Sequence, residues 1–348
     1  MFTMHVMGGL GNQLFQIFTA LAYSIQHDNK TLVFPYIEKL GAEHTGTTVR
    51  ITYWETLFRD LKQYTTFSKF SNNERNDLLN QLPTLQEPGF SYTPIPPVHD
   101  RNFRLFGYFQ SYKYFESNME QILKEKILLG PLREQVYEEH VSKYKGGNEC
   151  VSISMHFRLG DYKYKPDCHP ICSLEYYQKA LLFMTEDLSK DSDLLNPLLN
   201  DLVNDKVETK DEGDSLRSLV NDKVETKDEG DSLRSLGKNV RIRVFYFCEQ
   251  EDNEYVRKVR IEPLHHYFPH VEFIKVPDDI PDWKQLLFMT WCDRFILANS
   301  SFSWWGAYLG EHISKQRKKV TYPSPWFGPQ LAHNQTHDLC PPHWNKIN

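Results

Sequence analysis

The residues best suited to chemistry lie in one short stretch, HFRLGDY at residues 156–162. It closes a run that begins at Val151, in which apolar and polar residues alternate. This period of two predicts a strand and puts His156 and Arg158 on the same face; a glycine then permits a sharp turn before Asp161. An arginine at a strand end lies where open α/β sheets bind ligands, and its planar fork suits a diphosphate. The alternative is an edge strand whose surface arginine pairs with Asp161, and spacing alone leaves both open.

A glycine-rich loop near the start of the chain could bind an anion. Residues 2–7 are typical of a strand, and apolar residues from Leu14 to Ile25 recur at helical spacing. A loop between strand and helix aims backbone N–H groups at an anion. It is neither a Walker loop, which needs Gly-Lys-Ser/Thr, nor the dinucleotide fingerprint, whose third glycine position holds Leu14 here. A plain tight turn is the alternative. The loop residues are Gly8, Gly9, Leu10, Gly11, Asn12 and Gln13.

A third stretch, NSSFSWWGAYL at residues 299–309, follows a strand-like segment and opens a helix. Its asparagine or first serines can cap that helix, where hydroxyl and N–H groups would face a phosphate. The paired tryptophans are expected to wedge the helix against the sheet. The candidate residues here are Asn299, Ser300, Ser301, Phe302 and Ser303. Because three features of the same kind coincide, a phosphate-bearing ligand is favoured.

The elements that must position these stretches divide the chain into two expected domains, 1–147 and 148–348, with Gly146-Gly147 as the boundary. In the first, strands are expected at 31–35 and 103–109, a helix through about 129 and, after Pro131, another over 132–144, while 40–100 is irregular. In the second, a helix is expected from Ser173. Strands at 151–158, 241–248, 272–276, 294–298 and 319–322 alternate with helices at 251–262, 283–292 and 302–314. Such alternation predicts an α/β fold with a doubly wound parallel sheet.

Composition narrows the function classes. The 348 residues include 40% hydrophobic and 25% charged residues, as in a globular chain long enough for two domains. The net charge of −6 offers no basic surface for nucleic acid. No apolar run approaches the roughly 20 residues of a membrane span, and no signal peptide is visible. We therefore expect a cytoplasmic protein whose six cysteines are reduced.

One tract is duplicated. Residues 203–219 recur unchanged at 220–236, and both copies are polar. Two such copies cannot bury a core, so 203–236 is expected to be a surface insertion without a catalytic role. The Asp191-x-Asp193 pair lies just before this tract and not at a strand end, which makes it a poor metal site.

Four motifs in register carry a resemblance along nearly the whole chain: GGLGNQLFQ at 8–16, GYFQSYKYF at 107–115, HFRLGDY at 156–162 and NSSFSWWGAYL at 299–309. Together they resemble the alpha-1,2-fucosyltransferase family. The resemblance implies a GT-B-like fold of two Rossmann-like domains. It also implies transfer of L-fucose from GDP-fucose to a sugar hydroxyl, the 2-hydroxyl of a galactoside in a glycan, with inversion and without a metal or other cofactor.

The resemblance also assigns roles. Arg158 would hold the donor diphosphate, Asn12 would lie beside the phosphates, and the serines before Phe302 would touch the pyrophosphate. The general base stays open among His156, Asp161 and Glu249.

Two departures from the family pattern are visible. The family usually has a second arginine where this chain has Leu159, and an acidic turn is replaced by residues 248–252, which include Glu249. The donor could therefore be another GDP-sugar or a deoxysugar nucleotide. A non-catalytic module that binds nucleotide sugar or glycan is a further alternative. A zinc protein is another, suggested by Cys168, His169 and Cys172 and by His333, His337, Cys340 and His343.

Overall fold

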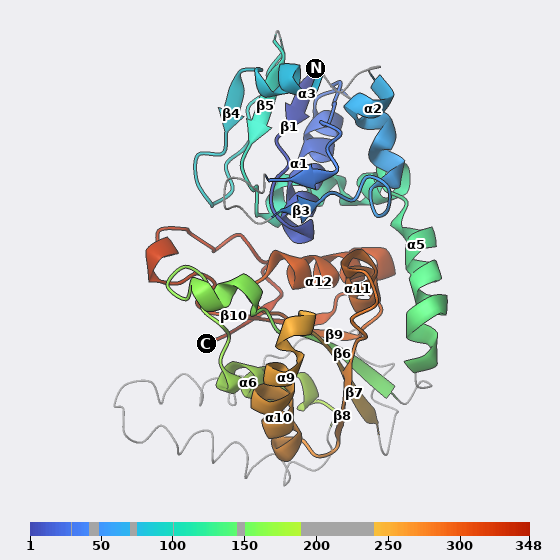
Figure 1. Cartoon of the computed structure of the whole chain (residues 1–348), viewed down its shortest axis with the longest axis vertical. Helices are drawn as coiled ribbons and strands as arrows, with labels where there is room; N and C mark the ends of the chain where they lie inside the picture. Colours follow the sequence, from blue (N-terminus) through green and yellow to red (C-terminus); the bar gives the residue numbers. More distant parts are fainter. Residues whose placement is uncertain (29, 42–48, 70–74, 100, 145–149, 189–239) are drawn as a thin grey trace, which may run out of the picture.

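The computed structural model describes residues 1–348 except 29, 42–48, 70–74, 100, 145–149 and 189–239 (Figure 1). The duplicated tract at 203–236, the Asp191-x-Asp193 pair and the expected boundary at Gly146-Gly147 lie outside the described residues. A three-stranded parallel sheet occupies the upper part of Figure 1 and a six-stranded parallel sheet the lower part. Two α/β halves that face each other across a cavity are the GT-B-like arrangement that the resemblance implies.

The six-stranded sheet has the order β11-β10-β9-β6-β7-β8, and every neighbouring pair is parallel. Its strands are β6 (Cys150–His156), β7 (Arg241–Phe247), β8 (Val271–Lys275), β9 (Arg294–Ile296), β10 (Lys319–Pro323) and β11 (Asn345–Ile347). The order reverses between β6 and β9, so the carboxyl ends of these two strands flank the switch point at which open α/β sheets bind ligands. The predicted doubly wound sheet is confirmed; β11 was not predicted.

Helices cover both faces of this sheet, as its two hydrophobic clusters show. Alternate residues of β7 enter different clusters: Phe245 and Phe247 join one, Val244 and Tyr246 the other. The first cluster also holds α11 and α12, and the second holds α6 and α10. The helices are α6 (Leu174–Thr185), α9 (Asn253–Val256), α10 (Glu262–Tyr267), α11 (Asp282–Met289) and α12 (Ser301–Ser314). Ser173 caps α6 by accepting a hydrogen bond from the Tyr176 amide, as expected of a serine at that position.

The three-stranded sheet has the order β1-β5-β4 and lies next to α1. Its strands are shorter than predicted, because β1 ends at Met4 and β5 at Phe106. The strand predicted at 31–35 is reduced to isolated bridges at Leu32 and Phe34. The elements are β1 (Phe2–Met4), α1 (Leu10–Gln26), β2 (Lys39–Leu40), β3 (Arg50–Ile51), α2 (Thr66–Lys69), α3 (Arg75–Asn80), β4 (Thr84–Gln86) and β5 (Phe103–Phe106).

A chain of short helical turns links the two sheets, and α5 runs down one side of the molecule in Figure 1. Pro131 does not separate two helices as predicted. It lies in the first turn of α5, where a backbone N–H group has no hydrogen-bond partner within the helix, so proline costs no hydrogen bond there. The segments are Tyr112–Tyr114, Glu116–Asn118, α4 (Met119–Gln121), Ile122–Lys126, α5 (Leu129–Val136), Tyr137–Val141 and Ser142–Tyr144. Of the helices in the described part of the chain, none combines the length and the apolar character needed to cross a bilayer.

The two halves share one apolar cluster where α12 packs on α1. Trp304 and Trp305 are fully buried, and Trp305 lies with its ring centroid 5.1 Å from that of Phe15 and 4.7 Å from that of Phe18. The paired tryptophans therefore wedge helix against helix across the two halves, whereas the sequence led us to expect helix against sheet. The approach is closest at Gly11, where a Cβ atom would lie 2.4 Å from the backbone carbon of Ser301.

We expect Gly11→Ala to lower the free energy of unfolding by about 1–3 kcal/mol, because the added methyl group forces α1 and α12 apart. Gly130→Ala is the matched control: a Cβ there meets nothing within 4 Å, in the first turn of α5. Urea unfolding monitored by tryptophan fluorescence measures both changes. Equal stability of the two variants would contradict the close packing.

Candidate functional site

A cavity of about 770 Å³ lies between the two halves. Residues from the glycine loop, from the β3 hairpin and from the ends of β6, β7 and β9 line it together. It therefore opens at the switch point of the six-stranded sheet. The predicted site residues in its wall are Gly8, Gly9, Gly11, Asn12, His156, Arg158, Asp161, Glu249, Asn299, Ser300, Ser301 and Phe302.

Two helix N-termini meet at this cavity. Gly9 is the N-cap of α1, and Ser300 is the N-cap of α12, where its side chain accepts a hydrogen bond from the Phe302 amide. Asn12 joins them: its Oδ1 accepts hydrogen bonds from Ser301 Oγ and from Gln110 Nε2, both at 2.8 Å. The unpaired N–H groups and the positive dipole ends of both helices therefore face one space, which favours an anion there.

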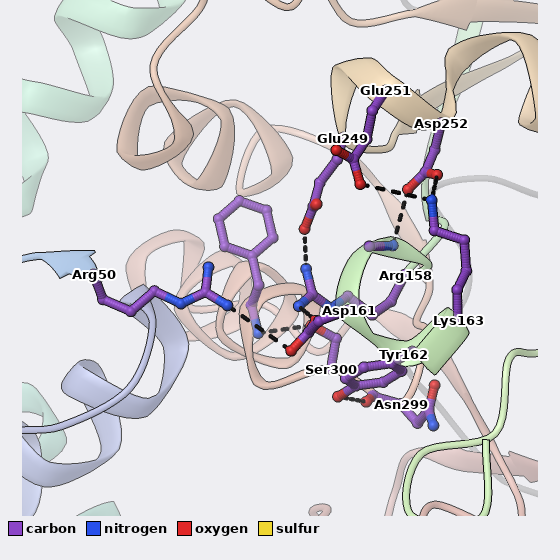
Figure 2. Close-up of polar contacts among 12 residues, drawn as sticks. Arg50, Arg158, Asp161, Tyr162, Lys163, Glu249, Glu251, Asp252, Asn299 and Ser300 are labelled. Atoms are coloured by element: carbon purple, nitrogen blue, oxygen red, sulfur yellow. Dashed lines mark hydrogen bonds and ion pairs between the residues drawn. The ribbon is translucent and has the colours of Figure 1, made fainter. Parts of the chain in front are cut away.

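Arg158 follows the carboxyl end of β6 and projects into the cavity (Figure 2). Its Nη1 donates to Glu249 and its Nη2 to Asp161, and the guanidinium carbon lies 4.9 Å from the centroid of the Tyr162 ring. Burial opposes its charge, but the neighbouring carboxylates prevail and raise the pKa of Arg158. Its side chain is 18% exposed and lines the cavity, so a ligand in the cavity can reach the guanidinium group. Arg158 is therefore a permanently charged group held in a fixed orientation.

The acidic side chains that follow β7 form ion pairs with basic side chains of the protein. Lys163 Nζ lies 2.6 Å from Asp252 Oδ1 and 3.6 Å from Glu251 Oε1, while Asp252 Oδ2 accepts the Gly160 amide (Figure 2). Glu249, Glu251 and Asp252 form the group of acids in the described part of the chain whose oxygens are near enough to share a metal ion. Since an ammonium group already occupies the space between two of them and Arg158 binds the third, these acids fit a metal ion poorly.

The turn after Arg158 depends on Gly160. It has a φ of +39°, and a Cβ there would lie 2.6 Å from Glu249 Oε2. A larger residue would thus push Glu249 away from Arg158. Leu159 turns into the second hydrophobic cluster and is 3% exposed, so it does not reach the cavity.

His156 lies in the cavity wall but is almost fully buried. Burial, reinforced by the charge of Arg158, lowers the pKa of His156 to about 3. Its ring centroid lies 5.5 Å from that of Phe302, and its Nδ1 has no hydrogen-bond partner among the described residues. His156 is therefore a neutral imidazole at ordinary pH.

Two of the predicted site residues lie outside the cavity wall. Gln13 is buried, and its Nε2 donates to the carbonyl oxygens of Gly8 at 3.0 Å and Ile51 at 2.8 Å. Ser303 is buried inside α12, where its Oγ donates to the Ser300 carbonyl oxygen. Neither lines the cavity, because one-residue steps along a helix point in different directions.

Arg50, Tyr53 and Asp282 are among the cavity residues that the sequence analysis did not identify. Arg50 and Tyr53 come from the stretch 40–100, which has no clear periodicity, and Asp282 opens α11. The Tyr53 hydroxyl donates to Asp282 across the two halves. Burial raises the pKa of Asp282 above its usual range. A Pro-Asp pair is typical of a helix start and could have located Asp282. No sequence pattern indicated Arg50 or Tyr53.

The zinc alternative is not supported by the described residues. Cys168 Sγ contacts Gln330 Oε1 at 3.2 Å, Cys172 Sγ contacts Asn299 Oδ1 at 3.6 Å, and His169 stacks on Tyr162. Burial raises the pKa of Cys172 to about 11, which keeps the thiol protonated and unsuited to bind zinc. His343 Nε2 lies 2.9 Å from Glu311 Oε1, and Cys340 is buried.

Comparison with known proteins places these features in context. No family model matches the sequence. The alpha-1,2-colitosyltransferase of Escherichia coli is 21% identical over 351 residues, which cover 98% of this chain and 96% of that protein. Among solved structures, a variant of Arabidopsis thaliana FUT1 in complex with GDP has a TM-score of 0.40 at 11% identity and covers 94% of this chain and 72% of its own. POFUT1 in complex with GDP has a TM-score of 0.38 at 14% identity over 92% of this chain and 97% of its own. The full-length similarity to a glycosyltransferase confirms that this chain resembles the fucosyltransferase-like sugar transferases.

Proposed function

We propose that the protein is a GDP-sugar glycosyltransferase that moves L-fucose from GDP-fucose to the 2-hydroxyl of a galactoside, with inversion and without a metal. One observation carries the proposal: the N-termini of α1 and α12 meet in a cavity that also holds Arg158. Three sources of positive potential on one wall fit the diphosphate of a nucleotide sugar.

The same wall would stabilise the leaving group. Cleavage of the bond between the anomeric carbon and the diphosphate builds negative charge on the phosphate oxygens and positive charge on the sugar ring. Arg158 and the backbone N–H groups of both helix starts would stabilise the departing charge. Because Ser301 and Gln110 hold the amide oxygen of Asn12, its Nδ2 group, which lies beside Gly8, would be left to donate to a phosphate.

Other parts of the wall suit the remaining groups of the substrates. Glu249 and Asp278, which follow β7 and β8, can accept hydrogen bonds from ribose hydroxyls or guanine N–H groups. The exposed ring of Tyr108, together with Phe90 and Phe327, offers apolar faces on which a sugar acceptor can stack. This division leaves room for a donor and an acceptor in one cavity.

The name of the Escherichia coli relative favours a second candidate donor, GDP-colitose. Purified protein incubated with GDP-fucose or GDP-colitose, with and without a galactoside, separates the two by release of GDP and formation of glycoside. Transfer of neither sugar and hydrolysis of neither donor, despite binding of GDP, would indicate a non-catalytic binding module.

The acceptor hydroxyl needs a proton acceptor, and Asp282 meets this need best. His156 is too weak a base with a pKa of about 3, and Asp161 and Glu249 are bound to Arg158. Asp282 lines the same cavity, and burial raises the pKa of its carboxyl group, which strengthens it as a base.

We expect Arg158→Ala to reduce transfer and donor hydrolysis roughly 100- to 1000-fold, because it removes a preorganised donor to the leaving group. Arg158→Lys should recover part of the activity, since it restores the charge without the planar fork. Arg257→Ala serves as the control, because Arg257 is exposed and does not line the cavity. Circular dichroism checks the fold, and near-normal turnover of Arg158→Ala would refute the phosphate role.

We expect dialysis against EDTA to leave the transfer rate unchanged, because Lys163 and Arg158 supply the positive charge at the acids after β7. The rate is measured before and after dialysis and after addition of Mn²⁺. Loss of activity that Mn²⁺ restores would show that a divalent cation takes part.

We expect Asp282→Asn to lower kcat for transfer roughly 100-fold while GDP affinity stays within a factor of two, because general bases typically contribute 10²–10⁴-fold. Only ionised Asp282 can accept a proton, so activity should fall as the pH drops through its raised pKa. The hydrogen bond from Tyr53 lowers this pKa, so Tyr53→Phe should move the acid limb to higher pH. An acid limb that persists in Asp282→Asn would exclude Asp282 as the base.

A further inference from the structure

Arg158 is not the only basic side chain that could neutralise a diphosphate in the cavity. Among the described lining residues, Arg50 and Arg158 are the two basic side chains other than histidine. Four carboxylic acids line the same cavity: Asp161, Glu249, Asp278 and Asp282. Because Arg158 is already bonded to two of these acids, a second basic side chain would add to the two helix N-termini in binding a ligand with two or more negative charges.

Arg50 reaches this position from the opposite half of the molecule. It belongs to β3, and Figure 2 shows its guanidinium directed at Asp161, with Arg158 on the other side of that carboxylate. Arg50 Nη2 lies 3.9 Å from Asp161 Oδ2, while Arg158 Nη2 donates to Asp161 Oδ1. One internal carboxylate thus sits between two guanidinium groups, which marks a place where anionic oxygens fit.

The contact between Arg50 and Asp161 is weak enough to be exchanged. Their side chains are 37% and 43% exposed, and exposed ion pairs at such a distance contribute little to stability. A phosphate carries more charge than a carboxylate and accepts several charge-assisted hydrogen bonds, so it would compete well for the Arg50 side chain.

The backbone around Arg50 is fixed more firmly than its side chain. Gln13 in α1 donates to the carbonyl oxygen of Ile51 and to that of Gly8, which ties β3 to the glycine loop. The Thr52 amide donates to the Glu38 carbonyl oxygen at 3.0 Å. Arg50 is therefore anchored beside the helix start that faces the cavity. Gln13, predicted as a donor-binding residue, has this positioning role instead.

We propose that Arg50 binds the diphosphate of the nucleotide donor, opposite Arg158, and supplies the second guanidinium group of the site. This inference rests on the proposed function. The diphosphate would lie between the two arginines, close to the place that the Asp161 carboxylate now takes. Arg50 would then stabilise the leaving group from the half of the molecule that carries the glycine loop.

Calorimetric titration with GDP, GMP and guanosine at constant ionic strength tests this inference on the whole protein. In Arg50→Gln, GDP should bind about 10- to 100-fold more weakly than to the unaltered protein, as expected for the loss of charge-assisted hydrogen bonds. GMP should lose less affinity and guanosine none. Arg50→Lys should recover part of the GDP affinity. Lys39→Gln is the matched control, because Lys39 lies on the paired strand β2, is exposed and does not line the cavity.

The outcomes separate this inference from the proposed function. Unchanged GDP affinity in Arg50→Gln, with tight binding by the unaltered protein, would overturn the role of Arg50 and leave the proposed function intact. An equal loss for guanosine and GDP would assign Arg50 to the nucleoside and likewise overturn the inference. Failure of the unaltered protein to bind GDP or GMP would overturn the proposed function, and the role of Arg50 with it.

Discussion

The contact between the first turns of α1 and α12 is the constraint on which the rest of the structure depends. Two positive helix ends repel each other, so they stay together only because large rings behind them, led by Trp305 and Phe15, bury apolar surface. Gly11 permits the approach, and Asn12 bridges the gap to Ser301. The aromatic cluster thus maintains an electrostatic arrangement that would be unfavourable without an anion in front of it.

The cavity wall separates its charges by element. The acids follow β6, β7 and β8 or open α11, whereas the backbone donors of the two helix starts belong to α1 and α12. Asp161 and Glu249 orient Arg158 and also partly neutralise its charge. We infer that such a wall selects a ligand with both anionic and hydroxyl-rich parts, which is the chemistry of a nucleotide sugar.

The sequence predicted the six-stranded half well because its strands and helices alternate with clear periods. The strands near 241–248 and 319–322 and the helix from Ser173 agree with the structure within a residue or two. The elements of the first half were harder to predict, because β3 and β4 have only two and three residues, too few to show a periodic pattern. Arg158, Asn12 and the serines at 300–301 were identified because they sit at element ends. Arg50, Tyr53 and Asp282 come into the cavity only through long-range packing, which local patterns do not encode.

The apolar cluster that spans both sheets has a thermodynamic consequence. Since residues such as Phe18 and Phe288 belong to one continuous core, neither half can lose its structure without exposing the buried face of the other. The two α/β halves therefore form a single cooperative unit in unfolding, unlike two domains joined by a flexible linker. Separately expressed halves would lack the wall of the cavity and part of the core that shapes it.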